Sequence, residues 1–311
     1  MKRIAVITPV KHLPGVPELL EIKGEVFYLE NGTKEEVRKL ILEKEVNILV
    51  CNPNKQGYKV DKELLIDTEI TLVNTCSTGL NHIDLKYCEE HSIEVQSLTK
   101  DLNLIKQLPS TSELGFGLLL DLLRNITKSN QEVKENKTWD YTSFIGHQLK
   151  DYKVGVVGYG RLGKMMHSYL KAFGADVRCY DPYVDPLYTP GKSVNSLENL
   201  FDYCDAISLH VHVTDETRGF ITEDLLSRNV KYLVNTSRGE IVDENAIVKS
   251  LREGKLKGYA TDVIADEFGD IQNSPLLKLQ NQDLNIIFTP HVGGMTIEGQ
   301  TLAFTHSINK L

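Results

Sequence analysis

A glycine-rich turn between an expected strand and an expected helix constrains this chain more than any other feature. The apolar run Lys153–Val157 leads directly into Gly158-Tyr159-Gly160-Arg161-Leu162-Gly163, and a helix is expected over 164–173. In this order Gly158 permits a tight turn, Gly160 lets the backbone approach a pyrophosphate, and Gly163 allows the helix to pack closely on the strand. The N-terminus of the helix then offers oriented N–H donors to the anion. The pattern predicts a βαβ unit that binds a dinucleotide.

An acidic residue after the next expected strand indicates which dinucleotide is bound. Asp181 follows the run 176–180 and lies about twenty residues beyond Gly158, where a carboxylate accepts both ribose hydroxyls of NAD and would repel the 2′-phosphate of NADP. One alternative is that Asp181 only opens the turn at Pro182. A second is that the nearby cation Arg178 favours NADP. We expect NAD as the cofactor.

Apolar runs of strand length alternate with expected helices along most of the chain, which is typical of βαβ units and parallel sheets. Strands are expected at 4–7, 26–29, 48–51, 72–73, 93–95, 153–157, 176–180, 231–234, 257–261 and 286–288. Helices are expected at 35–44, 85–91 and 112–124, and 128–137 is expected to be a polar segment. The alternation stops over 99–109, where we expect a hinge.

The length of 311 residues suits two domains that each bury a core. We predict an α/β fold with two doubly wound parallel-sheet domains and a cleft between them. Residues 1–103, completed by 295–311, are expected to form a flavodoxin-like substrate domain. Residues 104–294 are expected to form a Rossmann domain that binds NAD.

Composition excludes several classes of function. Acidic residues outnumber Lys and Arg by 43 to 35 and no long basic run occurs, which argues against binding to nucleic acid. The first apolar stretch, 4–7, is too short for a signal peptide or a membrane span, so we expect a cytoplasmic protein without membrane contact. The five cysteines include no C-x-x-C pair, so neither a disulfide framework nor a metal site is expected, and a lone reactive thiol is the less common alternative.

Three polar side chains follow three later strands of the second series. Arg238 comes after 231–234, Glu267 after 257–261, and His291 after 286–288. Because carboxyl ends of parallel strands share one edge, we expect the three side chains to gather there. Arginine suits bidentate binding of a carboxylate, and a histidine exchanges a proton near neutral pH. A carboxylate beside that histidine favours the imidazolium. Together they suit hydride transfer to a 2-oxo acid.

Each of these residues also has an interpretation without chemistry. Arg238 could be a partner in a surface ion pair, Glu267 a solvated loop acid, and His291 simply one of nine histidines. Taken one at a time, those interpretations are favoured. Three strand ends that converge on one edge reverse the preference.

In these motifs the chain resembles the D-isomer-specific 2-hydroxyacid dehydrogenase family. The resemblance covers about residues 144–296, and its motifs are specific in combination. It is carried by 144–163, 179–183, 208–210, 235–239, 262–267 and 289–294. The segment from Ser77-Thr78-Gly79 to Asp84 is similar to the substrate-domain loop of the family.

The resemblance implies roles for the three convergent residues and for a larger set around the cofactor. It implies that Arg238 binds the substrate carboxylate, that His291 is the acid/base, and that Glu267 is its partner. It places Arg161 and Leu162 on the pyrophosphate, Asp181 on the adenosine ribose and Asp262 near the nicotinamide amide. The expected cofactor-binding residues are Gly158, Gly160, Arg161, Leu162, Gly163, Asp181, His210, Thr236, Asp262 and Gly293.

The resemblance also implies contacts outside the cofactor domain. The backbone of Ser77, Thr78 and Gly79 would hold the substrate carboxylate. Asn54 is a candidate for reading the substrate tail, although Asn52 and Lys55 in the same loop are alternatives. Family members are usually homodimers through the cofactor domain, and the expected apolar helix at 112–124 is the candidate contributor.

Two functions are compatible with these residues. The first is an active dehydrogenase that interconverts a small D-2-hydroxy acid and its 2-oxo acid. The second is an NAD-sensing binding protein that uses the same fold with little or no turnover. A sensing protein could retain all of these motifs, and we expect the enzyme because the sequence shows no extra interaction tail.

Overall fold

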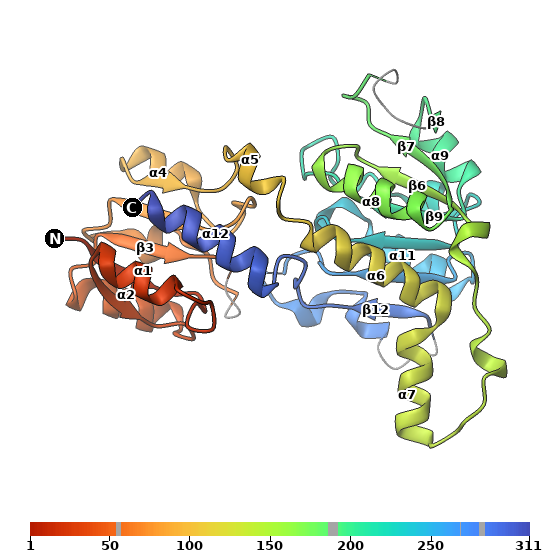
Figure 1. The fold of residues 1–311 in the computed structure, drawn as a ribbon, viewed down its shortest axis with the longest axis horizontal. Coiled ribbons are helices and arrows are strands. Elements are labelled where there is room, and N and C mark those ends of the chain that lie inside the picture. Colours follow the sequence, from red (N-terminus) through yellow and green to blue (C-terminus); the bar gives the residue numbers. More distant parts are fainter. Residues whose placement is uncertain (54–56, 186–191, 268, 280–283) are drawn as a thin grey trace. The chain divides into compact units, whose positions relative to one another are not determined.

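The computed structural model describes residues 1–53, 57–185, 192–267, 269–279 and 284–311. Its contacts divide the chain into two compact units, which are described separately below (Figure 1). The first unit comprises Met1–Leu108 and Gly294–Leu311, and the second comprises Pro109–Gly293.

The first unit is built on a five-stranded sheet with the order β2-β1-β3-β4-β5, in which every pairing is parallel. The strands are β1 (Arg3–Val6), β2 (Glu25–Tyr28), β3 (Ile48–Cys51), β4 (Leu72–Thr75) and β5 (Glu94–Gln96). The helices are α1 (Val16–Lys23), α2 (Lys34–Glu43), α3 (Lys62–Leu65), α4 (Leu85–Glu90), α5 (Leu102–Ile105) and α12 (Ile297–Asn309). This strand order is the flavodoxin-like one, as the sequence predicted.

The second unit is built on a seven-stranded parallel sheet with the order β12-β11-β10-β9-β6-β7-β8. Its strands are β6 (Lys153–Val157), β7 (Asp176–Tyr180), β8 (Lys192–Ser193), β9 (Ala206–Leu209), β10 (Tyr232–Asn235), β11 (Gly258–Thr261) and β12 (Ile286–Phe288). Its α-helices are α6 (Ser110–Arg124), α7 (Ile126–Asn136), α8 (Arg161–Ala172), α9 (Leu197–Tyr203), α10 (Glu223–Leu226) and α11 (Glu244–Arg252). The order is that of a Rossmann sheet, which confirms the predicted fold class.

The strand β6 occupies the point where the order of the second sheet reverses. The chain proceeds from β6 to β7 on one side and later returns to β9 on the other. Ligands of open α/β sheets bind beyond the carboxyl ends of the strands at such a point. The glycine-rich turn therefore begins where this fold most readily accepts a ligand.

The helix α6 belongs to the core of the second unit. Leu119 and Leu122 are fully buried, and the helix packs on α8, β10 and β11 of the same unit. The apolar face that the sequence suggested as an interface between subunits is therefore used inside the unit. The apolar pattern of this helix indicates that one face is buried, but it does not identify the surface on which that face packs.

Two helices differ from expectation for identifiable reasons. The segment expected to be merely polar forms α7, which buries no side chain and is supported by hydrogen bonds one turn apart, Gln131 to Glu135 and Asn136 to Glu132. The helix α8 begins at Arg161 rather than at 164, with Gly160 as its N-cap. The last glycine of the motif thus lies within the first turn of the helix.

No helix among the described residues is both long enough and apolar enough to cross a lipid bilayer.

Candidate active site

The loops that follow six strands of the second sheet carry the predicted site residues. Parallel pairing brings the carboxyl ends of these strands into register. Asn235 pairs with Thr261 and Thr261 with Phe288, and Val157 pairs with Leu209. The predicted residues of the second unit therefore lie beyond one edge of one sheet, as expected from the strand order.

The glycine loop fits a dinucleotide phosphate. Gly158 has a φ of 88°, and an added Cβ there would collide with the carbonyl oxygen of His210. A Cβ on Gly163 would collide with the carbonyl of Gly158, so the helix approaches the turn as closely as glycine allows. By contrast, a Cβ on Gly160 would meet no atom within 4 Å. That open side, at the N-terminus of α8, is where an anion can approach the backbone N–H groups.

The carboxylate of Asp181 is fixed against this loop. It accepts a hydrogen bond from the backbone N–H of Tyr159 at 2.7 Å and another from that of Tyr183 at 2.9 Å. Asp181 therefore does shape its own turn, but it also sits beside the glycine motif with a charge that suits ribose hydroxyls.

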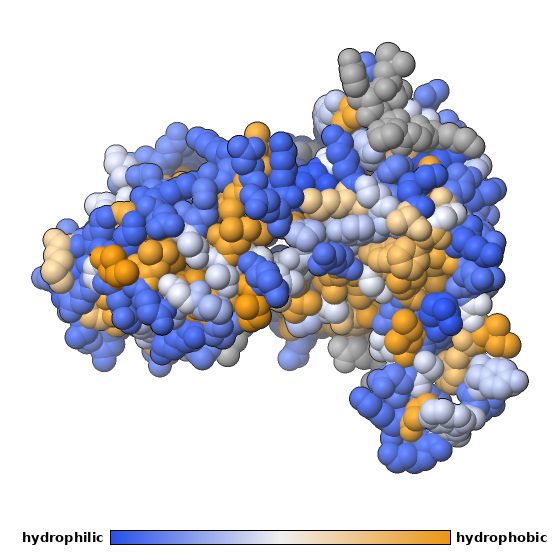
Figure 2. Space-filling model, viewed as in Figure 1, coloured by the Kyte–Doolittle hydropathy of each residue, from blue (hydrophilic) through white to orange (hydrophobic). Residues whose placement is uncertain are grey.

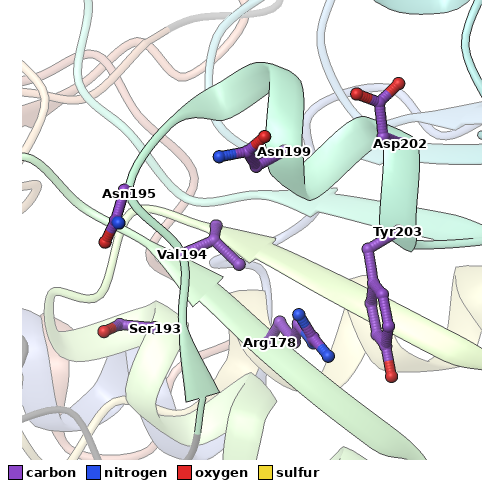
Figure 3. A pocket seen from close by; sticks show the side chains of 7 residues that line it. All are labelled: Arg178, Ser193, Val194, Asn195, Asn199, Asp202 and Tyr203. Atoms are coloured by element: carbon purple, nitrogen blue, oxygen red, sulfur yellow. The ribbon is translucent and has the colours of Figure 1, made fainter.

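Arg178, the cation that could have favoured NADP, is engaged elsewhere. Its guanidinium carbon lies 3.2 Å from the centre of the Tyr203 ring on α9. Both side chains line an open pocket of about 450 Å³, together with Ser193, Val194, Asn195, Asn199 and Asp202 (Figure 3). The stacking on Tyr203 removes the main argument for NADP.

His210 and Thr236 follow β9 and β10, and both are packed into the sheet edge. The Nε2 atom of His210 lies 2.8 Å from the Ser208 hydroxyl, and burial lowers the pKa of His210 to about 4, so the ring is neutral at pH 7. The Thr236 side chain is buried and its hydroxyl has no hydrogen-bond partner among the described residues. This oxygen lies beside Gly115 of α6, so the hydroxyl faces the core of the unit.

His291 and Glu267 are brought together. The Nδ1 atom of His291 lies 2.8 Å from an Oε atom of Glu267, and the Glu267 side chain is only 16% exposed. With a carboxylate oxygen as the acceptor, the hydrogen of this contact is assigned to Nδ1, and Nε2 takes no part in it. His291 has a φ of 53°, a left-handed conformation that is uncommon outside glycine.

Asp262 organises the loop that carries His291. Its buried carboxylate accepts hydrogen bonds from the Thr289 hydroxyl at 2.5 Å and from the backbone N–H groups of Val292 and Gly293 at 2.8 Å each. Burial raises the pKa of Asp262, whereas these three donors oppose the rise. The ends of β11 and β12 are thereby joined through one side chain.

Arg238 lies in the turn between β10 and the short 3₁₀ helix η4 (Gly239–Ile241). Its carbonyl accepts a hydrogen bond from the Asn235 side chain at 2.9 Å, and its guanidinium donates to the carbonyl of Ser237 at 2.6 Å. A Cβ on Gly239 would collide with the backbone of Ile264 and Ala265. The arginine loop therefore packs directly on the loop that carries Glu267.

In the first unit, Ser77 to Gly79 form a turn after β4 that is held by a small polar network. The Ser77 hydroxyl donates to the carbonyl of Gly79 at 2.7 Å. The Thr75 hydroxyl lies within 3.2 Å of Ser77, Asn52 and His82 side-chain atoms. Sequence reasoning missed this role of Thr75 and His82, because no spacing pattern marks it. Asn54 lies outside the described residues.

The five cysteines are all buried and none is paired in a disulfide. Burial raises the pKa of each thiol, for Cys76, Cys179 and Cys204 to about 12. A thiolate is therefore disfavoured at neutral pH, and packing accounts for these residues.

Comparison with known proteins gives consistent matches to one family. Residues 4–105 match the model of the D-isomer specific 2-hydroxyacid dehydrogenase catalytic domain, and residues 116–293 match the model of the NAD binding domain of the same family. The second match confirms NAD as the cofactor that the glycine loop and Asp181 predict.

Curated relatives carry several names. The chain is 33% identical over 295 residues to D-3-phosphoglycerate dehydrogenase of Methanocaldococcus jannaschii, covering 93% of this chain and 53% of that relative. It is also 33% identical over 297 residues to a 2-hydroxyacid dehydrogenase homolog of Zymomonas mobilis, covering 91% and 86% respectively. The chain thus spans about half the length of the phosphoglycerate dehydrogenases that it matches.

Solved structures share the fold over nearly the whole chain. D-lactate dehydrogenase from Aquifex aeolicus, complexed with NAD and lactic acid, aligns with a TM-score of 0.78 at 26% identity, covering 99% of this chain and 94% of that one. The apo D-lactate dehydrogenase from Escherichia coli aligns with a TM-score of 0.81 at 21% identity, covering 99% and 95%, and shows the fold alone.

Substitutions at two glycines of the loop should separate folding from cofactor binding. Gly158→Ala forces a left-handed residue and a collision, so it should lower the free energy of unfolding by about 1–2 kcal/mol or more and weaken NADH binding. Gly160→Ala has room in the protein itself, so the melting temperature should stay within a few degrees while NADH binding weakens about tenfold or more. Thermal melts and NADH fluorescence titration measure the two effects.

Gly117→Ala is the matched control, because this exposed helical glycine also has open space around it. It should leave NADH affinity unchanged and raise stability slightly. Wild-type NADH affinity in Gly160→Ala would show that the cofactor does not approach the backbone there.

Proposed function

Because the chain belongs to the D-isomer-specific 2-hydroxyacid dehydrogenase family, we propose that it is an NAD-dependent oxidoreductase that interconverts a small D-2-hydroxy acid and its 2-oxo acid. The observation that carries the proposal is the 2.8 Å contact between His291 and Glu267 at the sheet edge that also carries Arg238. Such a pair supplies the proton exchange that reduction of a carbonyl requires.

Each of the three residues has a distinct part in the proposed reaction. Arg238 binds the substrate carboxylate, for which its planar fork of donors is suited. NAD, when bound, accepts or supplies the hydride. His291 gives the proton on Nε2 to the carbonyl oxygen during reduction and takes it back from the hydroxyl during oxidation. Glu267 holds Nδ1 and stabilises the ring while it carries the positive charge.

The cofactor contacts are proposed on the same basis. Gly158, Gly160, Arg161, Leu162 and Gly163 would hold the pyrophosphate at the start of α8, and Asp181 the adenosine ribose. Thr236 and His210 would lie along the cofactor, and Gly293 and Asp262 near the nicotinamide amide. Support comes from the open side of Gly160 and from the position of the Asp181 carboxylate beside the glycine loop.

The first unit, Met1–Leu108 with Gly294–Leu311, is proposed as the substrate domain, and the second unit, Pro109–Gly293, as the cofactor domain. These bounds lie within a few residues of the expected 1–103 with 295–311 and 104–294. In the first unit the backbone of Ser77 to Gly79 would contact the substrate carboxylate. The names of relatives include phosphoglycerate and lactate dehydrogenases, whose substrates differ in size and charge. We therefore propose only the class, a small 2-oxo acid.

A panel of 2-oxo acids tests the proposal directly. Glyoxylate, hydroxypyruvate, pyruvate and phosphohydroxypyruvate are added in turn with NADH, and the loss of NADH absorbance is followed. At least one acid should be reduced. Flat absorbance with all four, in protein that still binds NADH, would favour a dinucleotide-sensing protein instead.

Variants assayed with the preferred acid test the assigned roles. His291→Asn should lower kcat by about 10²–10⁴-fold with little change in KM, because it removes the proton donor and leaves the carboxylate contact. Arg238→Ala should raise KM and lower kcat/KM by roughly tenfold to a hundredfold, because a charged hydrogen-bond donor is lost. NADH affinity, measured by fluorescence, should be unchanged in both. Retained kcat in His291→Asn would contradict its role.

We also propose a homodimer formed through the cofactor domain. The segment 126–145 exposes large apolar side chains, among them Ile126, Val133, Trp139, Tyr141 and Ile145. Figure 2 shows a few apolar residues among mostly hydrophilic ones around α7. Several large apolar side chains exposed within one short segment of the chain suit a surface that another chain covers, and a second copy of the chain is the proposed partner.

Charge placed in this segment should dissociate the dimer. Trp139→Glu combined with Ile145→Glu should convert a sedimenting dimer to a monomer, because the interface would have to bury unpaired carboxylates. Ile22→Glu, which alters an exposed apolar residue of α1, is the control and should leave the dimer intact. A wild-type protein that sediments as a monomer at micromolar concentration would overturn the proposal.

A further inference from the structure

A buried glutamate stands at the start of α11, outside the set of residues discussed so far. Glu244 is the first residue of this helix and is only 7% exposed. Acidic residues are common in first turns, but they normally lie in solvent and act through the helix dipole. A carboxylate that is buried instead requires hydrogen-bond partners.

Both oxygens of Glu244 have such partners. One accepts a hydrogen bond from the backbone N–H of Ala265 at 2.8 Å, and the other accepts one from the hydroxyl of Ser274 at 2.8 Å. Ser274 is itself buried. The helix cap is provided separately by Asp243, which accepts from Asn245 and Ala246. Glu244 is therefore free of any capping role and is committed to the loop after β11.

That loop is the one that carries Glu267. Ala265 lies two residues before Glu267, and between them Asp266 has a left-handed φ of 55°. A residue other than glycine keeps this conformation only where its surroundings hold it. Asp262 fixes the loop at its start, and Glu244 fixes it next to the bend.

A second contact links the Glu267 loop to the segment that carries Arg238. Gly239 packs directly on the backbone of Ile264 and Ala265. The segment from Arg238 to Glu244 therefore touches the Glu267 loop twice, once by close backbone packing and once by a charge-assisted hydrogen bond. Displacement of the loop would separate Glu267 from His291, which are 2.8 Å apart.

We propose that Glu244 is a positioning residue which, by holding the N–H of Ala265, sets the hydrogen bond between Glu267 and His291. Among the described charged residues of β11 and its following loop, Asp262 and Glu267 accept hydrogen bonds from the His291 loop, and Glu244 acts on the segment that carries Glu267. The effect on turnover rests on the proposed dehydrogenase function, whereas the effect on the histidine does not.

Two substitutions distinguish hydrogen bonding from mere filling of space. In Glu244→Gln, the amide oxygen can accept from Ala265 while its NH₂ donates to Ser274, so the loop should be held. In Glu244→Ala both contacts are lost. Glu253→Gln alters an exposed glutamate at the other end of α11 and serves as the control. Ser274→Ala removes one contact and serves if Glu244→Ala does not fold.

The first measurement is independent of turnover. In full-length protein labelled with ¹⁵N-histidine, the His291 Nδ1–H should give a downfield proton resonance that is protected from exchange, assigned by its absence in His291→Asn. This resonance should persist in Glu244→Gln and in Glu253→Gln. In Glu244→Ala it should broaden or disappear, as it should in Glu267→Ala, which removes the acceptor.

The second measurement is steady-state kinetics with the preferred acid. Glu244→Ala should lower kcat about tenfold to a hundredfold with NADH affinity within twofold of wild type, whereas Glu244→Gln should stay within about threefold. The double variant Glu244→Ala with Glu267→Ala should lose much less than the product of the single losses, because both act on one hydrogen bond.

The outcomes are distinguishable. A protected His291 resonance and wild-type kcat in folded Glu244→Ala, or losses that multiply in the double variant, would overturn the proposal. If the wild-type chain reduces no 2-oxo acid, the proposed function fails, and the resonance alone decides the role of Glu244.

Discussion

The parallel pairing of every strand in the second sheet is the constraint on which the rest of the site depends. It sends each carboxyl end to the same edge, so residues from distant parts of the chain meet without any long-range pattern in the sequence. It also requires a crossover between neighbouring strands, and one of these crossovers is the helix α8 that begins in the glycine loop. The parallel arrangement of the strands therefore explains the position of both the glycine loop and the residues proposed for catalysis.

Carboxylates then give this edge its rigidity; Asp262 and Glu244 are buried, and Asp181 is partly exposed. Asp181 holds the glycine loop, Asp262 holds the His291 loop, and Glu244 holds the Glu267 loop, in each case through backbone N–H groups. A carboxylate that leaves water must find donors, and a loop has N–H groups that no ladder satisfies. The carboxylates therefore accept hydrogen bonds from the loop N–H groups, and both are satisfied. The left-handed conformations at Asp266 and His291 persist because their loops are held in this way.

Prediction from sequence succeeded where a local pattern has one physical solution. The spacing from Gly158 to Gly163, with a strand before and a helix after, left little choice but a Rossmann turn. Prediction failed where a residue packs against an element that is far away in the sequence. The apolar residues of α6 did not reveal that they pack on α8 and β10, and the expected part of this helix in a dimer stays a prediction. The helix α7 carries too few apolar residues to show a period, and the network around Thr75 and His82 has no marker at all.

The sequence by itself determined the fold class, the cofactor and the three residues proposed for the chemistry, because glycine spacing and strand ends are local properties of the chain. Only the tertiary structure decided that Glu267 meets His291, that Arg178 stacks on Tyr203, and that Glu244 holds the Ala265 backbone. Those contacts join strands and helices far apart in sequence. They depend on how loops bend beyond the sheet, and no period or motif in the chain encodes that bend.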